Sequence, residues 1–166
     1  ERALRVVQYK SAKYTIERPL HIGAALAGAA PEVHAAFTAY GLPLGEAFQM
    51  RDDVLGIFGD PKETGSQPAT TFAREKRTVI IATALDRATD AQAAVIRTHL
   101  GDPALDAAGI ESLRTIICDT GALAFAEEQI TLRLDEALAA TASPHIAPVA
   151  QGFLAELAHA ATSRSV

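Results

Sequence analysis

The chain has 166 residues, of which 49% are apolar and 21% are charged, a balance typical of a folded globular protein and not of a disordered one. Its net charge of -5 argues against a nucleic-acid partner, because nucleic acids are bound by a basic surface. The sequence has no apolar run long enough to span a bilayer, and its single cysteine, Cys118, rules out an internal disulfide. We therefore predict a cytoplasmic protein without a membrane span.

Alanine and leucine abound and aromatic residues make up only 5% of the chain, which favours helices. Apolar residues recur at three- and four-residue steps between proline and glycine breaks, and no segment is typical of a strand. Pro19 is expected to bend the first helix, Pro43 to kink the second or split it in two, and Cys118 to pack in the core. The sequence thus predicts an all-α fold, with helices over about residues 4–27, 31–58, 71–87, 90–99, 110–119, 121–140 and 144–161.

The chain begins within a helical pattern. Residues 1–5 include neither a Met nor a residue that caps a helix, and they already read as the middle of a helix. This beginning predicts that the chain is a fragment, or one piece of a split protein.

Two adjacent carboxylates, Asp52 and Asp53, follow an otherwise apolar face of the helix expected over 31–58. Gln49 lies three residues before Asp52 and four before Asp53, so all three side chains can point into one cleft. Oxygen ligands of this kind suit Mg²⁺, which takes one or two carboxylates and completes its shell with water and substrate phosphates. The pair taken alone leaves two interpretations open, a Mg²⁺ site and a plain acidic pair on a solvated helix face.

Three motifs in this order resemble those of one enzyme family. The run from Phe48-Gln49 through Asp52-Asp53 to Gly59-Asp60-Pro61 and Thr64-Gly65 resembles the second aspartate-rich region of trans-isoprenyl diphosphate synthases, which include the farnesyl and geranylgeranyl diphosphate synthases. Upstream, residues 9–15 are similar to the family's Lys-Thr motif, with Ser11 where Thr is usual, and downstream residues 76–78 match its basic triplet. The resemblance implies that residues 1–166 are the C-terminal half of a polyprenyl diphosphate synthase domain. The implied fold is an antiparallel helix bundle of the isoprenoid synthase type, incomplete at its N-terminus.

The resemblance also implies a function and a set of site residues. The family's prenyltransferases use Mg²⁺ to condense an allylic prenyl diphosphate with isopentenyl diphosphate in isoprenoid biosynthesis. By resemblance, the metal ligands are Asp52 and Asp53, the catalytic residues are Lys10, Ser11 and Gln49, and the substrate-binding residues are Lys10, Phe48, Gln49 and Lys76. Family members usually dimerise, which implies a homodimer or association with an N-terminal half.

The sequence departs from the family pattern in two ways. Ser66 replaces a lysine that usually binds diphosphate, Thr70 and Thr71 replace two acids, and Gly56 is not acidic. The family's first Asp-rich motif is also missing, since no second Asp-Asp pair occurs in the sequence. We therefore expect this chain alone to be inactive. Three alternatives stay open: a non-catalytic or degenerate partner subunit of a synthase, a class I terpene cyclase-like protein, and a plain helical interaction domain.

Overall fold

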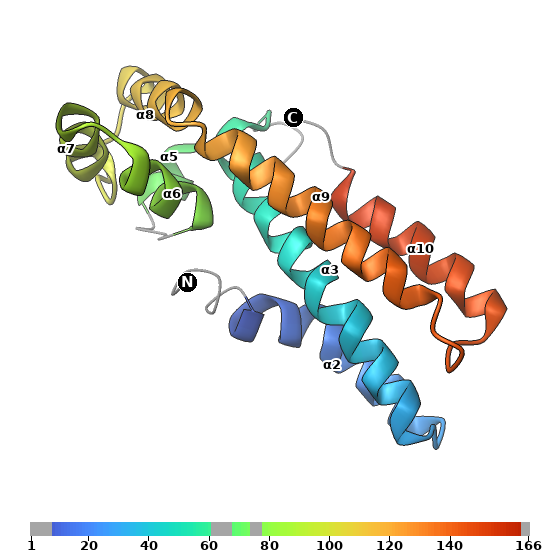
Figure 1. The fold of residues 1–166 in the computed structure, drawn as a ribbon. Coiled ribbons are helices and arrows are strands. Elements are labelled where there is room, and N and C mark those ends of the chain that lie inside the picture. Colours follow the sequence, from blue (N-terminus) through green and yellow to red (C-terminus); the bar gives the residue numbers. More distant parts are fainter. Residues whose placement is uncertain (1–7, 61–67, 74–77, 164–166) are drawn as a thin grey trace. The chain divides into compact units, whose positions relative to one another are not determined.

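The computed structural model describes residues 8–60, 68–73 and 78–163, without the side chains of residues 8–11 and 73. Every regular element in these ranges is a helix, as predicted (Figure 1). The chain divides into two compact units. The first unit comprises Glu1–Arg51 and Gln129–Arg164, and the second comprises Asp52–Glu128 with Ser165–Val166.

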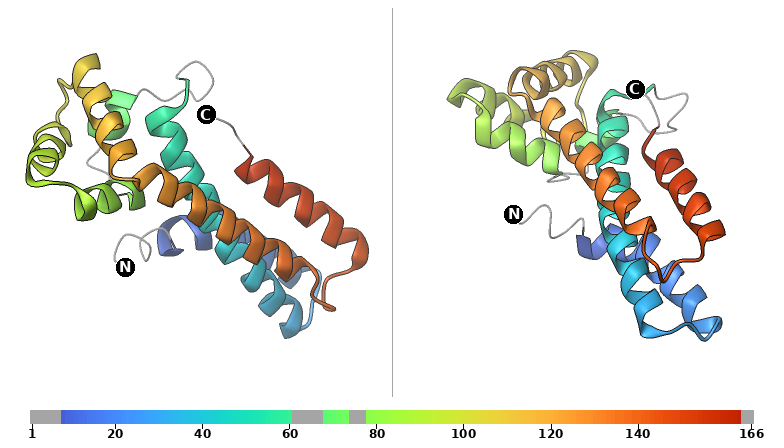
Figure 2. Two further views of the ribbon diagram at one scale, coloured as in Figure 1. Left: turned by 45° about the horizontal axis from the view of Figure 1, so that its top comes forward. Right: turned by 45° about the vertical axis from the view of Figure 1, so that its right-hand side comes forward.

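The first unit is a helical bundle built from both ends of the chain. It contains the π-helix η1 (Gln8–Glu17), α2 (Arg18–Leu26), α3 (Pro31–Phe58) up to Arg51, α9 (Ala122–Thr141) from Gln129, and α10 (Pro148–Thr162). Its core is formed by Tyr40 and Leu44 of α3, Ala137 of α9 and Ala158 of α10, with Ile16 and Leu20 packed against them. Figure 2 shows the parts of α3, α9 and α10 that belong to this unit lying lengthwise beside one another.

Two glycines let η1 approach α3 closely. A Cβ atom on Gly45 would lie 2.4 Å from the Cα atom of Ala12, and one on Gly41 would lie 3.0 Å from the Cα atom of Glu17. The two glycines are four residues apart and so lie on one face of α3. The residue numbers of η1 fall as those of α3 rise, so the two elements run antiparallel. A side chain at position 45 would force the backbones apart.

The second unit is a cluster of short helices that follow one another in the sequence. The end of α3 is followed by α5 (Pro68–Ala73), α6 (Val79–Arg87), α7 (Asp90–His99), α8 (Ala107–Asp119) and the start of α9 (Figure 1). Three of these helices begin at a side chain that accepts a backbone N–H: Thr78 before α6, Thr89 before α7 and Asp106 before α8. Such caps satisfy N–H groups that have no partner within the helix.

Several predicted elements differ from the observed ones. The single helix expected over 71–87 is wrong, because Thr78 has an extended backbone and caps the start of α6. The helix expected over 4–27 is two elements in its described part, and Pro19 lies in the first turn of α2, where a missing N–H costs nothing. Pro43 does not split α3, which continues through it.

Smaller differences concern two helix starts and one side chain. Helix α8 starts at Ala107 instead of residue 110, and α10 starts at Pro148 instead of residue 144. Cys118 is exposed, although it was expected in the core. The buried face of α8 is formed by Leu113, Ile116 and Ile117, and the cysteine lies outside that face. None of the helices in the described ranges is long and apolar enough to cross a membrane.

Candidate functional site

The predicted metal ligands lie near the end of α3. Asp53 is only 6% exposed and Asp52 is half-buried. Each of the two residues has an interaction partner. A buried carboxylate carries a large desolvation cost unless it is paired or bound to a cation. The interpretation of this pair as a plain solvated helix face is therefore wrong for Asp53.

The donor set fits Mg²⁺. Two adjacent carboxylates supply the hard oxygen atoms that this ion prefers, and substrate phosphates and water usually provide its remaining ligands. Among the described residues there is no group of three or more His, Cys, Asp or Glu side chains that could hold a metal by themselves.

Two further predicted residues lie one turn before the aspartates. Phe48 and Gln49 of α3 are both half-buried, and each interacts with another group. Gln49 belongs to the first unit and Asp52 to the second, since the division falls directly after Arg51. The continuous helix α3 carries both residues.

The predicted residues Lys10 and Ser11 are part of the η1 backbone, whereas their side chains lie outside the described part of the structure. They directly precede Ala12, which packs on Gly45. Because η1 and α3 run antiparallel, the chain before Ala12 continues along α3 in the direction of Gln49. The backbone of Lys10 and Ser11 therefore passes at a level between Gly45 and Gln49.

The buried carboxylate of Glu46 lies one turn before Gln49 on α3. Arg133 Nε of α9 lies 2.9 Å from Glu46 Oε2, and the two charged groups form an ion pair. The angle at this nitrogen does not suit a hydrogen bond. Arg133 also forms an ion pair with Glu136. Burial raises the pKa of Glu46, the positive charge of Arg133 lowers it in part, and Glu136 raises it further. The pair fixes α9 against the part of α3 that leads to Gln49.

The positions where the family pattern is broken have different surroundings. Lys76 and Ser66 lie outside the described residues, so their predicted roles stay predictions. Thr70 is exposed, while Thr71 packs on α3, where a Cβ atom added to Gly56 would lie 3.1 Å from Thr71 Oγ1. The neutral residues at positions 56 and 71 thus form a close contact between α3 and α5.

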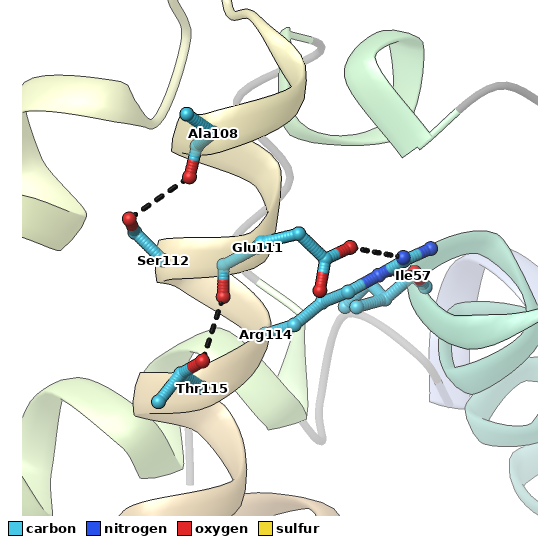
Figure 3. Close-up of polar contacts among 6 residues, drawn as sticks. All are labelled: Ile57, Ala108, Glu111, Ser112, Arg114 and Thr115. Carbon is cyan, nitrogen blue, oxygen red and sulfur yellow. Dashed lines mark hydrogen bonds and ion pairs between the residues drawn. The ribbon is translucent and has the colours of Figure 1, made fainter.

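Sequence reasoning missed two features that support these residues. One is the pair of glycines at positions 41 and 45, whose four-residue spacing on a helix was visible in the sequence. The other is Arg114 of α8, whose Nε donates a 2.8 Å hydrogen bond to the carbonyl of Ile57 at the end of α3 (Figure 3). No local signal connects Arg114 with α3, because the contact joins residues 57 positions apart.

The sequence is similar to a well-populated group of known proteins. The family model described as polyprenyl synthetase matches residues 1–117. Geranylfarnesyl diphosphate synthase of Aeropyrum pernix is 34% identical over 122 residues, which are 74% of this chain and 37% of that protein. Geranylgeranyl diphosphate synthase of Mycobacterium tuberculosis is 31% identical over 119 residues, which are 72% of this chain and 34% of that protein.

Solved structures are similar over nearly the whole chain. A geranylgeranyl pyrophosphate synthase from Corynebacterium glutamicum, complexed with isoprenyl diphosphate and magnesium, matches 98% of this chain and 46% of its own with a TM-score of 0.93 and 37% identity. A polyprenyl synthase from Caulobacter crescentus CB15, complexed with calcium and isoprenyl diphosphate, matches 99% and 49% with a TM-score of 0.83 and 28% identity. The chain thus spans less than half the length of these relatives. The predicted fold class is confirmed, and the chain belongs to the polyprenyl synthetase family.

Proposed function

We propose that this chain is part of a Mg²⁺-dependent polyprenyl diphosphate synthase, which condenses an allylic prenyl diphosphate with isopentenyl diphosphate. The observation that carries the proposal is Asp53, a carboxylate only 6% exposed, next to Asp52 in a segment that the family model covers. The Corynebacterium glutamicum relative complexed with isoprenyl diphosphate and magnesium supports both the ion and the class of substrate.

In this proposal each predicted residue has a role. Asp52 and Asp53 hold Mg²⁺, directly or through water. Gln49 orients the metal's water or the substrate, Lys10 binds the diphosphate, and the Ser11 hydroxyl lies beside the developing carbocation. Phe48 lines the apolar chain pocket, and Lys76 binds diphosphate at the mouth of the cleft. Bound Mg²⁺ supplies neutralisation of the diphosphate charge, which is what the departure of this group requires.

The register of η1 supports the roles of Lys10 and Ser11. The contact between Ala12 and Gly45 directs the preceding backbone along α3 towards Gln49. This register supports a shared site for Lys10, Ser11 and Gln49. We propose in addition that the side chains of Lys10 and Ser11 point towards Gln49.

The test is prenyl transfer by the complete synthase that contains this chain, with Asp52→Asn and Asp53→Asn in this chain. We expect each substitution to lower kcat/KM by about a hundredfold or more, because charge stabilisation of a leaving group contributes several kcal/mol. Asp135→Asn is a matched control, since it makes the same chemical change at an exposed carboxylate of α9 outside the proposed site. Wild-type-like turnover by both aspartate variants would contradict the proposal.

The exposed apolar faces of the first unit support association with another polypeptide. Ile22 and Leu26 of α2 are 60% and 85% exposed, and Val149, Phe153 and Leu157 of α10 are 71%, 68% and 51% exposed. The α10 residues recur every fourth position and form one stripe, on the side of the helix away from Ala158. Apolar stripes of this kind mark interaction surfaces.

The occupant we propose is a polypeptide equivalent to the part of the relatives that this chain does not span, because that part is more than half of each relative. It would also supply the first Asp-rich motif, so the 166-residue chain by itself should not turn over substrate. Size-exclusion chromatography with light scattering tests the association, alone and with that polypeptide added. A stable dimer of the chain alone would indicate that a second copy of this chain covers the apolar faces. Turnover by the chain alone would refute its dependence on the added polypeptide.

A second candidate is a degenerate partner subunit that packs against a complete synthase. The contact of Gly56 with Thr71 favours it, since this contact fills with neutral atoms a region where family members carry acids. If this chain combined with that polypeptide condenses no substrate, but gains activity with Ser66→Lys, Thr70→Asp and Thr71→Asp together, the result would support this candidate. Activity of the unmodified combination would exclude it.

A further inference from the structure

Arg114 supplies a hydrogen bond and a positive charge that the C-terminus of α3 does not have itself. The last four carbonyl groups of a helix lack partners within it. In α3 the N–H of Gly59 bonds to Leu55 O, and Ile57 O accepts from Arg114 Nε at 2.8 Å. The last turn of α3 contains no basic residue, so the cation that favours a helix C-terminus comes from α8.

The guanidinium group of Arg114 is itself held from two sides. Glu111 Oε1, one turn earlier on α8, accepts from an Arg114 terminal nitrogen at 2.6 Å, and the guanidinium carbon lies 6.0 Å from the centre of the Phe58 ring. Figure 3 shows the Arg114 side chain extending from α8 to the end of α3, with the Glu111 carboxylate against it. The arginine is therefore fixed in place and reaches two consecutive residues of α3.

This contact lies one helical turn after the proposed metal ligands. Ile57 follows Asp53 by four residues, so the two lie on the same face of α3. All of these residues belong to the second unit, and Ile57 is only 1% exposed. A frayed last turn of α3 would release the helical bonds that begin at Asp53, since each N–H bonds to the carbonyl four residues earlier.

We propose that Arg114 is a positioning residue for the metal site: by holding Ile57 and Phe58 it keeps the turn that carries Asp52 and Asp53 in a metal-binding geometry. The inference rests on the proposed function, because it assigns Arg114 a role towards the ion those aspartates bind. The effect is mainly geometric, since the adjacent Glu111 neutralises much of the arginine's charge. Groups that support metal ligands in this way typically change metal affinity about 10- to 100-fold when removed.

The experiment measures how the activity of the complete synthase that contains this chain depends on Mg²⁺, together with Mn²⁺ binding by electron paramagnetic resonance. For Arg114→Gln we expect the Mg²⁺ concentration at half-maximal activity to rise about tenfold, with kcat recovered at saturating Mg²⁺. Arg114→Lys keeps one donor and should recover part of the affinity. Glu111→Gln keeps the bond to Ile57 and should change the affinity less than threefold, roughly.

Ser112→Ala is the matched control, because Ser112 is exposed on the same helix and its hydroxyl donates to Ala108 O within that helix (Figure 3). An Arg114→Gln variant that loses activity equally at all Mg²⁺ concentrations would overturn the positioning role, since that is the result of a purely structural defect. An unchanged Mg²⁺ dependence would overturn it as well.

The variant Asp53→Asn distinguishes this failure from failure of the proposed function. If Asp53→Asn raises the Mg²⁺ requirement and Arg114→Gln does not, the function stands and the role of Arg114 is wrong. If Asp53→Asn leaves the Mg²⁺ dependence unchanged, the metal site is wrong and the role of Arg114 fails with it.

Discussion

The two units of the chain are stabilised in different ways. In the first unit, contacts join residues from opposite ends of the sequence: the Tyr40 hydroxyl donates to Leu154 O at 2.8 Å, and Arg51 Nε donates to Thr162 O at 2.9 Å. In the second unit, the consecutive helices α6, α7 and α8 are each capped at the start by the side chain of the preceding residue. The first unit therefore depends on packing between distant segments, and the second depends more on local sequence.

The difference matters for the candidate site. The proposed metal ligands Asp52 and Asp53 belong to the second unit, whereas the proposed catalytic residues Lys10, Ser11 and Gln49 belong to the first. Substitutions in the first unit should therefore change stability by weakening the packing of η1 and α10 on α3. Substitutions at the caps of the second unit should act on single helices.

The largest effect is expected where η1 docks on α3. Gly45→Ala should lower the free energy of unfolding by about 3 kcal/mol, because even a methyl group would overlap with Ala12 and neither backbone can move cheaply. Urea unfolding followed by circular dichroism measures the change. A loss below about 0.5 kcal/mol, the size of an ordinary surface change, would mean that this close approach does not hold the first unit.

Tyr40 gives the next effect, which depends on pH. Burial raises the pKa of the Tyr40 hydroxyl from 10.0 to about 12. Because the folded-state pKa lies above the unfolded one, the stabilisation is complete below pH 10 and is lost as the pH rises through 12. A difference of two pKa units corresponds to about 2–3 kcal/mol.

Tyr40→Phe separates this contribution from the other groups that titrate at high pH. At pH 7 the variant should be less stable than the parent by about 1 kcal/mol, since the hydrogen bond from the Tyr40 hydroxyl to Leu154 O is lost. The order should have reversed by pH 12, because above pH 10 the parent must keep Tyr40 protonated or bury a charge. Parallel stability curves from pH 8 to 12 would show that Tyr40 does not titrate in this way.

The caps of the second unit give smaller effects. Thr78 accepts the N–H of Ile81 and Thr89 accepts that of Gln92, so Thr78→Ala and Thr89→Ala should each cost about 1 kcal/mol. Hydrogen exchange should show faster exchange in the first turn of the affected helix and little change in α10. Destabilisation of α10 by either substitution would contradict the distinction between the units.

The smallest effect should be a stabilisation. Gly152→Ala on α10 should raise the free energy of unfolding by about 0.5–1 kcal/mol, because glycine is unfavourable within a helix and a Cβ atom there would have nothing within 4 Å. The substitution is chemically identical to Gly45→Ala. The difference between the two changes in unfolding free energy therefore measures the effect of the close approach of η1 to α3. A destabilising result would show that position 152 is covered by a partner in solution.

The sequence could predict those features that depend on residues close together in the chain, such as helix bounds and short motifs. The bounds of the helix over 90–99 were predicted as found, because Thr89 and Gln92 form a capping box and Gly101 follows the helix. The Asp52-Asp53 segment and the family were recognisable for a similar reason, since the motif lies within one stretch of chain. The break between α5 and α6 was missed because neither glycine nor proline lies between residues 71 and 87.

Only the tertiary structure decided which distant segments meet. The sequence shows glycines at positions 41 and 45, but their partner could be identified only after η1 had packed on α3. Likewise, the sequence alone gives Arg114 no role beyond a charge on the surface of α8, and only the structure shows its hydrogen bond to Ile57. Local patterns fix the hydrogen bonds and apolar faces of single helices, whereas the choice of partner depends on how the whole chain buries those faces.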